Sequence, residues 1–495
     1  MLGLSLLLVA TLSPSAPWAR ADTIEAAWVV EENARPGTRD WRIPSSAPTD
    51  IEGYADRVSA GVGERVRLFV DTTASSFHVE AYRLGWYGGD GGRRIWTSSV
   101  VPGVQQRPPR MNAKTRMVEA RWIESLAFHV GEDWVQGTYL LKLVSSTGGQ
   151  AYVPLVLRDV TSTARILVTL PVNTWQAYND WGGASLYVGP SGSSSDRATV
   201  VSFDRPYHQT RGAGRMLSAL PLIALIESQG LDITYWTDMD LHSRPALVRQ
   251  HQSLLVLQHD EYWSTAMRSG VTKARAAGVN LAFLGGNAVY WHIRVEDSPL
   301  GDDRRIVCYK SKEADPLTGV DDDEVTVRWA EPPVSRPQST LLGAMYGCSG
   351  VVDEDFVVAD PDAWVFEGTG LRQGDVIPGV VNYEVDWIVQ RKPTPGNIQI
   401  LGHSPVRCGD GKSRFADMTY YTASSGAGVF YAANIGWLDG VRCGPPSPGE
   451  LCDPRVQTIT LNIIRAFATR PAGIDHPAQP NAADFGYTLK HPTSP

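Results

Sequence analysis

The sequence predicts an α/β domain built on a parallel sheet in three layers, preceded by an immunoglobulin-like β-sandwich. Two observations predict this order. From about residue 51 to 160, apolar and polar side chains alternate between Gly-rich turns, and no long helical stretch interrupts them. After Asp159, short apolar runs alternate with stretches of helical periodicity, which is typical of parallel strands covered by helices.

The first of these patterns has period two in three separate places. Such spacing is expected of strands with one buried face, and the Gly-rich turns between them favour a sandwich. The alternating residues are Phe77, Val79 and Ala81, then Tyr139, Leu141 and Leu143, and then Val153, Leu155 and Leu157. Trp86 and Tyr87 precede a glycine-rich turn, where they could bind sugar rings or simply pack on a neighbouring element.

The second pattern consists of apolar runs and amphipathic stretches. Strands buried on both faces are predicted at 166–170, 254–257 and 281–284. Helices are predicted at 215–228, 264–277 and 457–468, where apolar residues recur at three- and four-residue spacing.

We expect five segments along the 495 residues. The start of the chain is an apolar run that ends in Ala19-Arg20-Ala21, as in a signal peptide, although no Lys or Arg precedes the run. The run is too short to span a bilayer, so a secreted or extracytoplasmic protein without a transmembrane helix is expected. The segments are a signal peptide at 1–21, an arm or linker at 22–50, the β-sandwich at 51–160, the α/β domain at 161–475 and a loose C-terminal tail at 476–495.

Charge and cysteine content restrict the possible partners. A net charge of -8 without a long basic run argues against a nucleic-acid partner. The five cysteines all lie in the C-terminal half, so an exported chain can hold two disulfides and one free thiol. Cys443 and Cys452 bracket a short turn and form the first candidate pair, and Cys308 with Cys348 is the next, but spacing alone leaves the connectivity open.

Polar side chains follow each of the three predicted parallel strands. Tyr178 and Tyr187 come after the first strand, His259 and Glu261 after the second, and Asn287 after the third. Because ligands bind at the carboxyl ends of parallel strands, these loops are predicted to meet at one cleft. Each residue alone is also explained by a hydrogen bond that fixes a loop.

The third loop, Gly285-Gly-Asn287, follows a strand and precedes a turn, like the elbow on which some hydrolases display a nucleophile. An amide is no nucleophile, so Ser- or Cys-type covalent catalysis is not expected there. Asn287 can instead donate a hydrogen bond to a developing oxyanion or hold a water molecule.

These motifs resemble a known family. The runs Gln-Ala-Tyr178-Asn-Asp-Trp-Gly-Gly and Ser-Leu-Tyr187, the His259-X-Glu261 pair, and Gly-Gly-Asn287 beyond it are similar to the large (β) subunit of N,N-dimethylformamidase. The resemblance covers roughly residues 80 to 470. It implies an α/β domain similar to class I glutamine amidotransferases.

The resemblance also implies an iron site of two tyrosinates and a glutamate. Carried over, Tyr178, Tyr187 and Glu261 hold a ferric ion, with Tyr207 as the alternative second tyrosine. His259, Asn287 and Glu261 are then the catalytic residues. Phenolate oxygen is a hard donor that ionises at neutral pH only beside a strong Lewis acid, which suits ferric iron.

The expected function is therefore exported, iron-dependent hydrolysis of a C–N amide bond in a small molecule. Dimethylformamide itself is an improbable substrate for an exported protein. One alternative is a non-catalytic, envelope-associated protein that binds a glycan through Trp86 and Tyr87. Another is a hydrolase of a different bond that uses Glu261 with Asp260 or Asp238 as its second carboxylate.

Overall fold

The computed structural model describes residues 23–490. The predicted signal peptide at 1–21 and the end of the predicted tail, 491–495, lie outside the described residues. Within residues 23–490, no helix is both long and apolar enough to cross a membrane.

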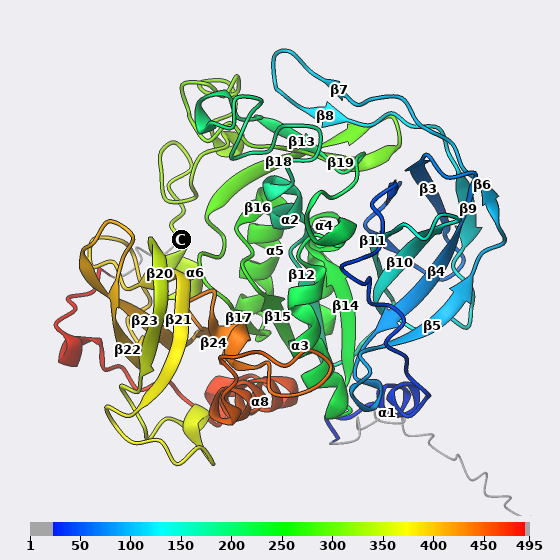
Figure 1. Cartoon of the computed structure of the whole chain (residues 1–495). Coiled ribbons are helices and arrows are strands. Elements are labelled where there is room, and N and C mark those ends of the chain that lie inside the picture. The colour runs from blue at the N-terminus through cyan, green and yellow to red at the C-terminus, as the bar shows by residue number, and fades with distance from the viewer. Residues whose placement is uncertain (1–22, 491–495) are drawn as a thin grey trace, which may run out of the picture.

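The N-terminal part consists of two sheets packed around an apolar core, at the right of Figure 1. Strands β4, β10 and β11 confirm the three predicted period-two segments, and every one of the predicted apolar residues is buried. One sheet has the order β1-β3-β9 and the other β2-β11-β10-β4-β5. The strands are β1 (Ile51–Ala55), β2 (Ser59–Ala60), β3 (Arg65–Thr72), β4 (Ser76–Leu84), β5 (Gly92–Thr97), β9 (Leu126–His129), β10 (Gly137–Ser145) and β11 (Gln150–Leu157).

The segment before this part is ordered by docking. Helix α1 (Ala27–Asn33) lies against the rest of the chain, and its last residue forms hydrogen bonds with three residues outside the helix. Asn33 donates from Nδ2 to Glu227 at 2.9 Å, and its Oδ1 accepts from the backbone N–H groups of Trp86 and Tyr87. Tyr87 is buried and donates to Glu32 at 2.6 Å. A ring held in this way packs inside the molecule, so it cannot serve as a sugar-binding platform.

The centre of the molecule is a sheet of seven strands in the order β14-β12-β15-β17-β24-β23-β22 (Figure 1). The first five pair in parallel, and β23 and β22 continue the sheet antiparallel. Strands β12, β15 and β17 confirm the three predicted apolar runs. The bounds are β12 (Ile166–Leu170), β14 (Ile233–Thr237), β15 (Ser253–Leu257), β17 (Asn280–Leu284), β22 (Gln399–Arg407), β23 (Ser413–Thr422) and β24 (Gly428–Tyr431).

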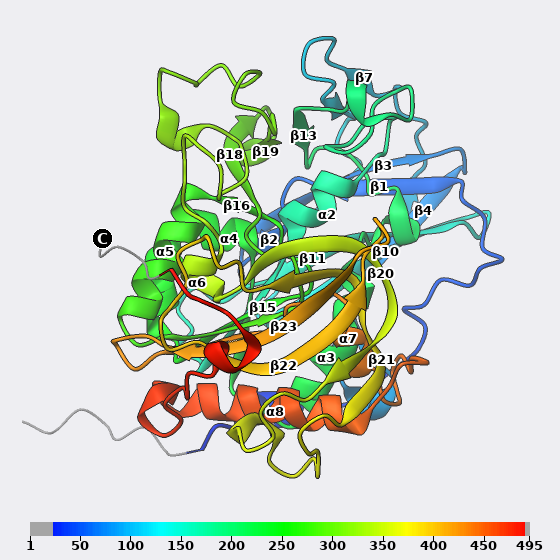
Figure 2. The ribbon, with the colours of Figure 1, turned by 90° about the vertical axis from the view of Figure 1, so that its left-hand side faces the viewer.

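Helices cover both faces of these central strands. Helices α3 (Met216–Ser228) and α8 (Pro454–Thr469) contribute to the core on one face, whereas α5 (Thr265–Ala276) packs on the other. Figure 2 shows the length of α8 along one side of the molecule. All three predicted helices are confirmed, with ends shifted by a few residues, because their apolar stripes fit a sheet that is buried on both faces.

The predicted fold class, a parallel three-layer α/β domain of the glutamine amidotransferase type behind an immunoglobulin-like sandwich, is wrong. The fold is β-rich and mixed, because much of the chain between 291 and 422 forms antiparallel hairpins rather than strand-helix units. Register shifts interrupt the period-two pattern in these hairpins, and apolar runs alone do not predict them. Their strands are β18 (Trp291–Ser298), β19 (Gly301–Val307), β20 (Met345–Val357) and β21 (Val376–Trp387), with β13 (Val200–Ser202) and β16 (Tyr262–Ser264) beside the first pair.

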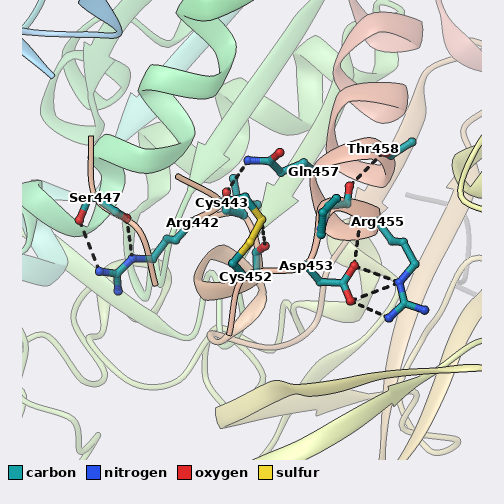
Figure 3. The surroundings of a disulfide bond; sticks show 11 residues. Arg442, Cys443, Ser447, Cys452, Asp453, Arg455, Gln457 and Thr458 are labelled. Carbon is teal, nitrogen blue, oxygen red and sulfur yellow. Dashed lines mark hydrogen bonds and ion pairs between the residues drawn. A yellow bond between two sulfur atoms is a disulfide. The ribbon is translucent and has the colours of Figure 1, made fainter. Parts of the chain in front are cut away.

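The C-terminal half contains two disulfides. Cys443–Cys452 was the first candidate pair and is confirmed, but Cys348 pairs with Cys408, and Cys308 is a buried free thiol. The alternative pair Cys308–Cys348 is wrong because Cys308 follows β19, whereas Cys348 lies on β20 beside the end of β22. Figure 3 shows how the Cys443–Cys452 loop is tied to α8, where Asp453 caps the helix and Gln457 donates to the carbonyl of Val441 at 2.8 Å.

The tail residues that the structure describes lie against the central sheet. Phe485 and Tyr487 contact the core, and the Tyr487 hydroxyl donates to Asp417 on β23 at 2.7 Å.

A buried ion pair joins the N-terminal sheets to helix α3. Arg83 on β4 and Glu227 on α3 are both 0% exposed and form two hydrogen bonds, of 2.7 and 3.0 Å. Tyr235 donates to the same carboxylate.

We predict that Glu227→Gln lowers the free energy of unfolding by about 3–5 kcal/mol, because the Arg83 charge is then buried without a counter-charge. Urea denaturation followed by tryptophan fluorescence measures this change. The matched control is Glu124→Gln, which removes the exposed pair with Arg65 and is expected to cost less than about 1 kcal/mol. If both variants lost a similarly small free energy of unfolding, burial of the Arg83–Glu227 pair would not be what makes Glu227 important.

Candidate active site

Two loops after neighbouring parallel strands approach each other closely. Gln258, directly after β15, has a φ of 61°, and the chain then turns through His259 and Glu261 into β16. The loop after β17 begins at Gly285, where an added Cβ would lie 2.0 Å from the carbonyl oxygen of Gln258. Only glycine permits this contact, which brings the two loops to one edge of the sheet.

The two predicted tyrosines converge on Glu261. Tyr178 is the last residue of α2 (Val172–Tyr178), the short helix after β12, and its hydroxyl lies 3.1 Å from one carboxylate oxygen of Glu261. The Tyr187 hydroxyl lies 2.7 Å from both oxygens. The two rings stack with 4.3 Å between their centroids. Both hydroxyls are therefore within hydrogen-bonding distance of the carboxylate of Glu261.

His259 completes this cluster. Its Nε2 lies 3.2 Å from Glu261 and 3.3 Å from the Tyr178 hydroxyl. On the other side of the ring, Nδ1 lies 3.1 Å from the carbonyl oxygen of Gly286, which favours a proton on Nδ1 and leaves Nε2 directed at the cluster. Tyr178, Tyr187, His259 and Glu261 are thus brought together, as predicted.

Electrostatics keep Glu261 ionised. Burial raises the pKa of this carboxyl, but His259, Lys310 and the Tyr187 hydroxyl outweigh burial and hold it below its usual value. Conversely, burial lowers the pKa of His259, yet Glu261 more than offsets this, so that the pKa of the imidazole is raised. Each of these two groups stabilises the charged form of the other, so the pair can hold a proton on the imidazole.

The two phenols, in contrast, disfavour their charged forms. Burial, above all, and then the neighbouring charges raise the pKa values of both Tyr178 and Tyr187. These hydroxyls therefore stay protonated unless a cation lies among the oxygens. The three donors are hard oxygen ligands at one point, so they fit a ferric ion, whose charge would reverse the preference.

Asn287 lies beside the cluster rather than in it. Its φ of 47° confirms an elbow-like backbone, and its Nδ2 donates to Glu384 on β21 at 2.8 Å. Glu384 in turn lies 3.9 Å from Nε2 of His259. Asn287 is therefore connected to His259 through Glu384, a residue that the sequence analysis did not identify.

Two cations flank the stacked tyrosines, and the sequence analysis missed both. The guanidinium carbon of Arg215 lies 4.5 Å from the Tyr178 ring centre, and Nζ of Lys310 lies 3.5 Å from that of Tyr187. Lys310 also faces the rings of Tyr262 and Trp291. No local signal marks either residue, since each reaches the site from an element outside the three strand-end loops.

The other sequence candidates lie apart from the cluster. Tyr207 is half-buried with its hydroxyl in the interior, and its charged neighbours are Asp238, Arg304 and Arg205 rather than Glu261. Asp238 and Asp260 are 0% exposed and face each other in the interior. Carboxylates without access to solvent give no support to a second-carboxylate mechanism with Glu261.

A cavity of about 400 Å³ opens beside the cluster. Tyr178, His259 and Glu384 reach its wall, so a ligand bound there contacts the cluster directly. The other lining residues include Trp175, Arg215 and Tyr383. Within residues 23–490, no group of three or more His, Cys, Asp or Glu side chains is arranged to hold a metal ion, so a metal at this site would depend on the tyrosine oxygens.

A carboxylate, two phenols and an imidazole that converge at strand ends beside a cavity are typical of an enzyme's ligand site. Comparison with known proteins gives the family. Residues 78–449 match the family described as N,N-dimethylformamidase beta subunit-like, C-terminal, and the chain belongs to that family. The resemblance predicted from the sequence motifs is therefore confirmed.

Two relatives are N,N-dimethylformamidase beta subunits. The one from Alcaligenes sp is 24% identical over 301 residues, which cover 53% of this chain and 38% of the relative. The one from Paracoccus aminophilus is 24% identical over 329 residues, which cover 58% of this chain and 42% of the relative. The matched region thus spans less than half the length of these relatives.

Two solved structures show only weak similarity to this chain. A Paenibacillus sp. cycloisomaltooligosaccharide glucanotransferase has a TM-score of 0.15 at 9% identity, covering 43% of this chain and 21% of its own. Cwp6 from Clostridium difficile has a TM-score of 0.14 at 13% identity, covering 48% and 37%. Scores this low do not establish a shared fold.

We predict that Lys310→Met stabilises the metal-free protein by about 0.5–2 kcal/mol, because methionine keeps the contact with the rings and removes a desolvated charge. Burial lowers the Lys310 pKa from its usual 10.5 to about 8. The folded state therefore binds this proton less tightly than the unfolded state does. The destabilisation is full below pH 8 and fades as the pH rises towards 10.5.

Urea denaturation at pH 7 and at pH 9.5 measures this difference. The gain of the variant over wild type should be larger at the lower pH. A loss of stability at pH 7 would instead show that contacts with the three rings outweigh the desolvation of the ammonium group.

Proposed function

We propose that this protein is an exported, iron-dependent hydrolase of C–N amide bonds. The observation that carries the proposal is the convergence of the Tyr178 and Tyr187 hydroxyls on the buried carboxylate of Glu261. Membership of the dimethylformamidase beta-subunit family supports amide hydrolysis as the reaction class. Two disulfides support an oxidising compartment, in agreement with the predicted export.

Tyr178, Tyr187 and Glu261 are the residues that would hold the iron. Bound there, ferric iron supplies a Lewis acid that polarises an amide carbonyl and lowers the pKa of water. This set of oxygen donors leaves room for substrate, because the cavity reaches Tyr178.

We assign the neighbouring residues to proton transfer and to the positioning of other side chains. His259 keeps Nε2 towards the cluster, where it can take a proton from water and deliver it to the departing amine nitrogen. Glu384 favours the charged imidazole, and Asn287 holds Glu384 in place with a 2.8 Å hydrogen bond. We therefore assign to Asn287 the positioning of Glu384, with oxyanion stabilisation as a second possible role once substrate is bound.

The first test is metal content. In protein purified from iron-supplemented cells, near-stoichiometric iron and a visible tyrosinate-to-iron absorption band are expected. Tyr178→Phe, Tyr187→Phe and Glu261→Ala should each lose most of the iron, because each removes one anionic donor. Elemental analysis with a visible spectrum provides both measurements.

The matched control is Tyr207→Phe. It removes another buried phenol that has no contact with Glu261, so iron and colour should be unchanged. If the parent protein binds no iron, or if Tyr207→Phe loses it as Tyr187→Phe does, the proposed ligand set is wrong.

A second prediction separates proton transfer from metal binding. His259→Ala should keep its iron but lose about 100-fold or more in turnover of amides, since general acid-base groups contribute on this scale. Glu384→Gln, which removes the negative charge beside His259, should also keep its iron and lower turnover. The measurement is amine release from a panel of amides, with iron assayed in parallel. Loss of iron together with turnover would mean that these side chains build the metal site instead.

A further inference from the structure

The cavity is too large for the smallest amides. Its volume of about 400 Å³ falls in the range of pockets that bind ligands of drug size, whereas dimethylformamide has only a few non-hydrogen atoms. The lining combines aromatic and charged side chains, so a ligand that fills the cavity needs both kinds of chemistry.

Arg215 is the arginine that lines this cavity. Among the described residues, Asp439 pairs with Arg442 at 3.4 Å, and Glu384 accepts from Asn287 and interacts with the charges of His259 and Arg215. Arg215 forms no ion pair within residues 23–490, and its guanidinium carbon lies 4.5 Å from the centre of the Tyr178 ring. Its hydrogen-bond donors are thus available to an anion, and a carboxylate matches their planar geometry.

Tyr383 supplies an aromatic surface at the rim. It lies on β21 directly before Glu384, with a φ of 66°, a conformation that bulky residues rarely adopt. Asn382 fixes this turn, because its Oδ1 accepts from the Tyr383 N–H and its Nδ2 donates to Asp353. The side chain is 54% exposed and lines the cavity, so an apolar group of a ligand can pack on it.

We propose that the substrate is an N-acyl amino acid with a large apolar side chain. Arg215 binds the carboxylate, and Tyr383 packs on the side chain. Arg215 lies against the ring whose hydroxyl contacts Glu261, so the anion must be near the reacting amide. In an N-acyl amino acid, a single carbon atom separates the carboxylate from the amide nitrogen. Hydrolysis adds water across the C–N bond, so the oxygen goes to the acyl carbon as a carboxylic acid and the proton goes to the amine of the free amino acid.

This inference rests on the proposed amidase function for its chemistry, and a binding experiment without amides tests the pocket separately. The probes are hydrocinnamate, which has a carboxylate and a phenyl ring, and hydrocinnamyl alcohol, its neutral counterpart. Isothermal titration calorimetry on the full chain should give at least about tenfold tighter binding of hydrocinnamate, the scale of a charge-assisted hydrogen bond.

Three variants locate the effect. Arg215→Gln should abolish the preference for hydrocinnamate, and Arg215→Lys should keep part of it. Tyr383→Ala should weaken both probes in parallel. The control Arg465→Gln changes an exposed arginine on α8 and should behave like wild type. A thermal melt of each variant establishes that it is folded. Equal binding of the two probes to wild type, or a preference that survives Arg215→Gln, would overturn the proposal.

Turnover measurements then distinguish the proposed substrate class from the proposed amidase function. Wild type should hydrolyse N-acetyl-L-phenylalanine in preference to neutral N-acetylphenethylamine, and Arg215→Gln should remove the preference. If the neutral amide is hydrolysed as well as the acid, the amidase function stands and the substrate class is wrong. If hydrocinnamate binds through Arg215 but no amide is hydrolysed, the carboxylate pocket stands and the amidase function fails.

Discussion

The negative charge of Glu261 is the constraint on which the rest of the site depends. The residue is 2% exposed, and a carboxylate withdrawn from water must find donors or cations within the protein. The surrounding chain provides two phenols, an imidazole and a more distant ammonium group. The two phenols come from the segment after β12, the imidazole from the loop that carries Glu261 itself, and the ammonium group from the segment after β19. Three segments of the chain therefore converge because one buried charge has to be satisfied.

The central strands make this convergence possible. Strands β12, β15 and β17 run in parallel, so the loops that follow them leave the sheet at the same edge. The close contact at Gly285 then fixes the distance between the second and third loops. The antiparallel hairpins add the outer wall, since Glu384 comes from β21 and Lys310 follows β19. The mixed character of the fold thus contributes directly to the site, because a purely parallel sheet would supply only the first three loops.

The sequence predicted the parts of the fold that depend on local burial. An uninterrupted apolar run such as 166–170 has one stable environment, a strand covered on both faces, and it matches β12. The same reasoning located Tyr178, His259 and Glu261 at strand ends. It could not locate Glu384, which lies 97 residues beyond its hydrogen-bond partner Asn287, on a hairpin with register shifts. Such pairing depends on long-range contacts, and these shifts leave no regular period in the sequence.

The side chains at the cavity also restrict the chemistry of the nucleophile. The free thiol of Cys308 is near Lys310, but burial raises its pKa to about 12, so the reactive thiolate is not formed at neutral pH. Ser218 lines the cavity, yet it donates to the carbonyl oxygen of Arg215 and accepts from Gln258, so no base is placed to activate it. Neither side chain can attack an amide carbonyl. The proposed hydrolysis would therefore use water as its nucleophile, and for that step it would need both the proton-accepting position of His259 and the oxygen donors beside it.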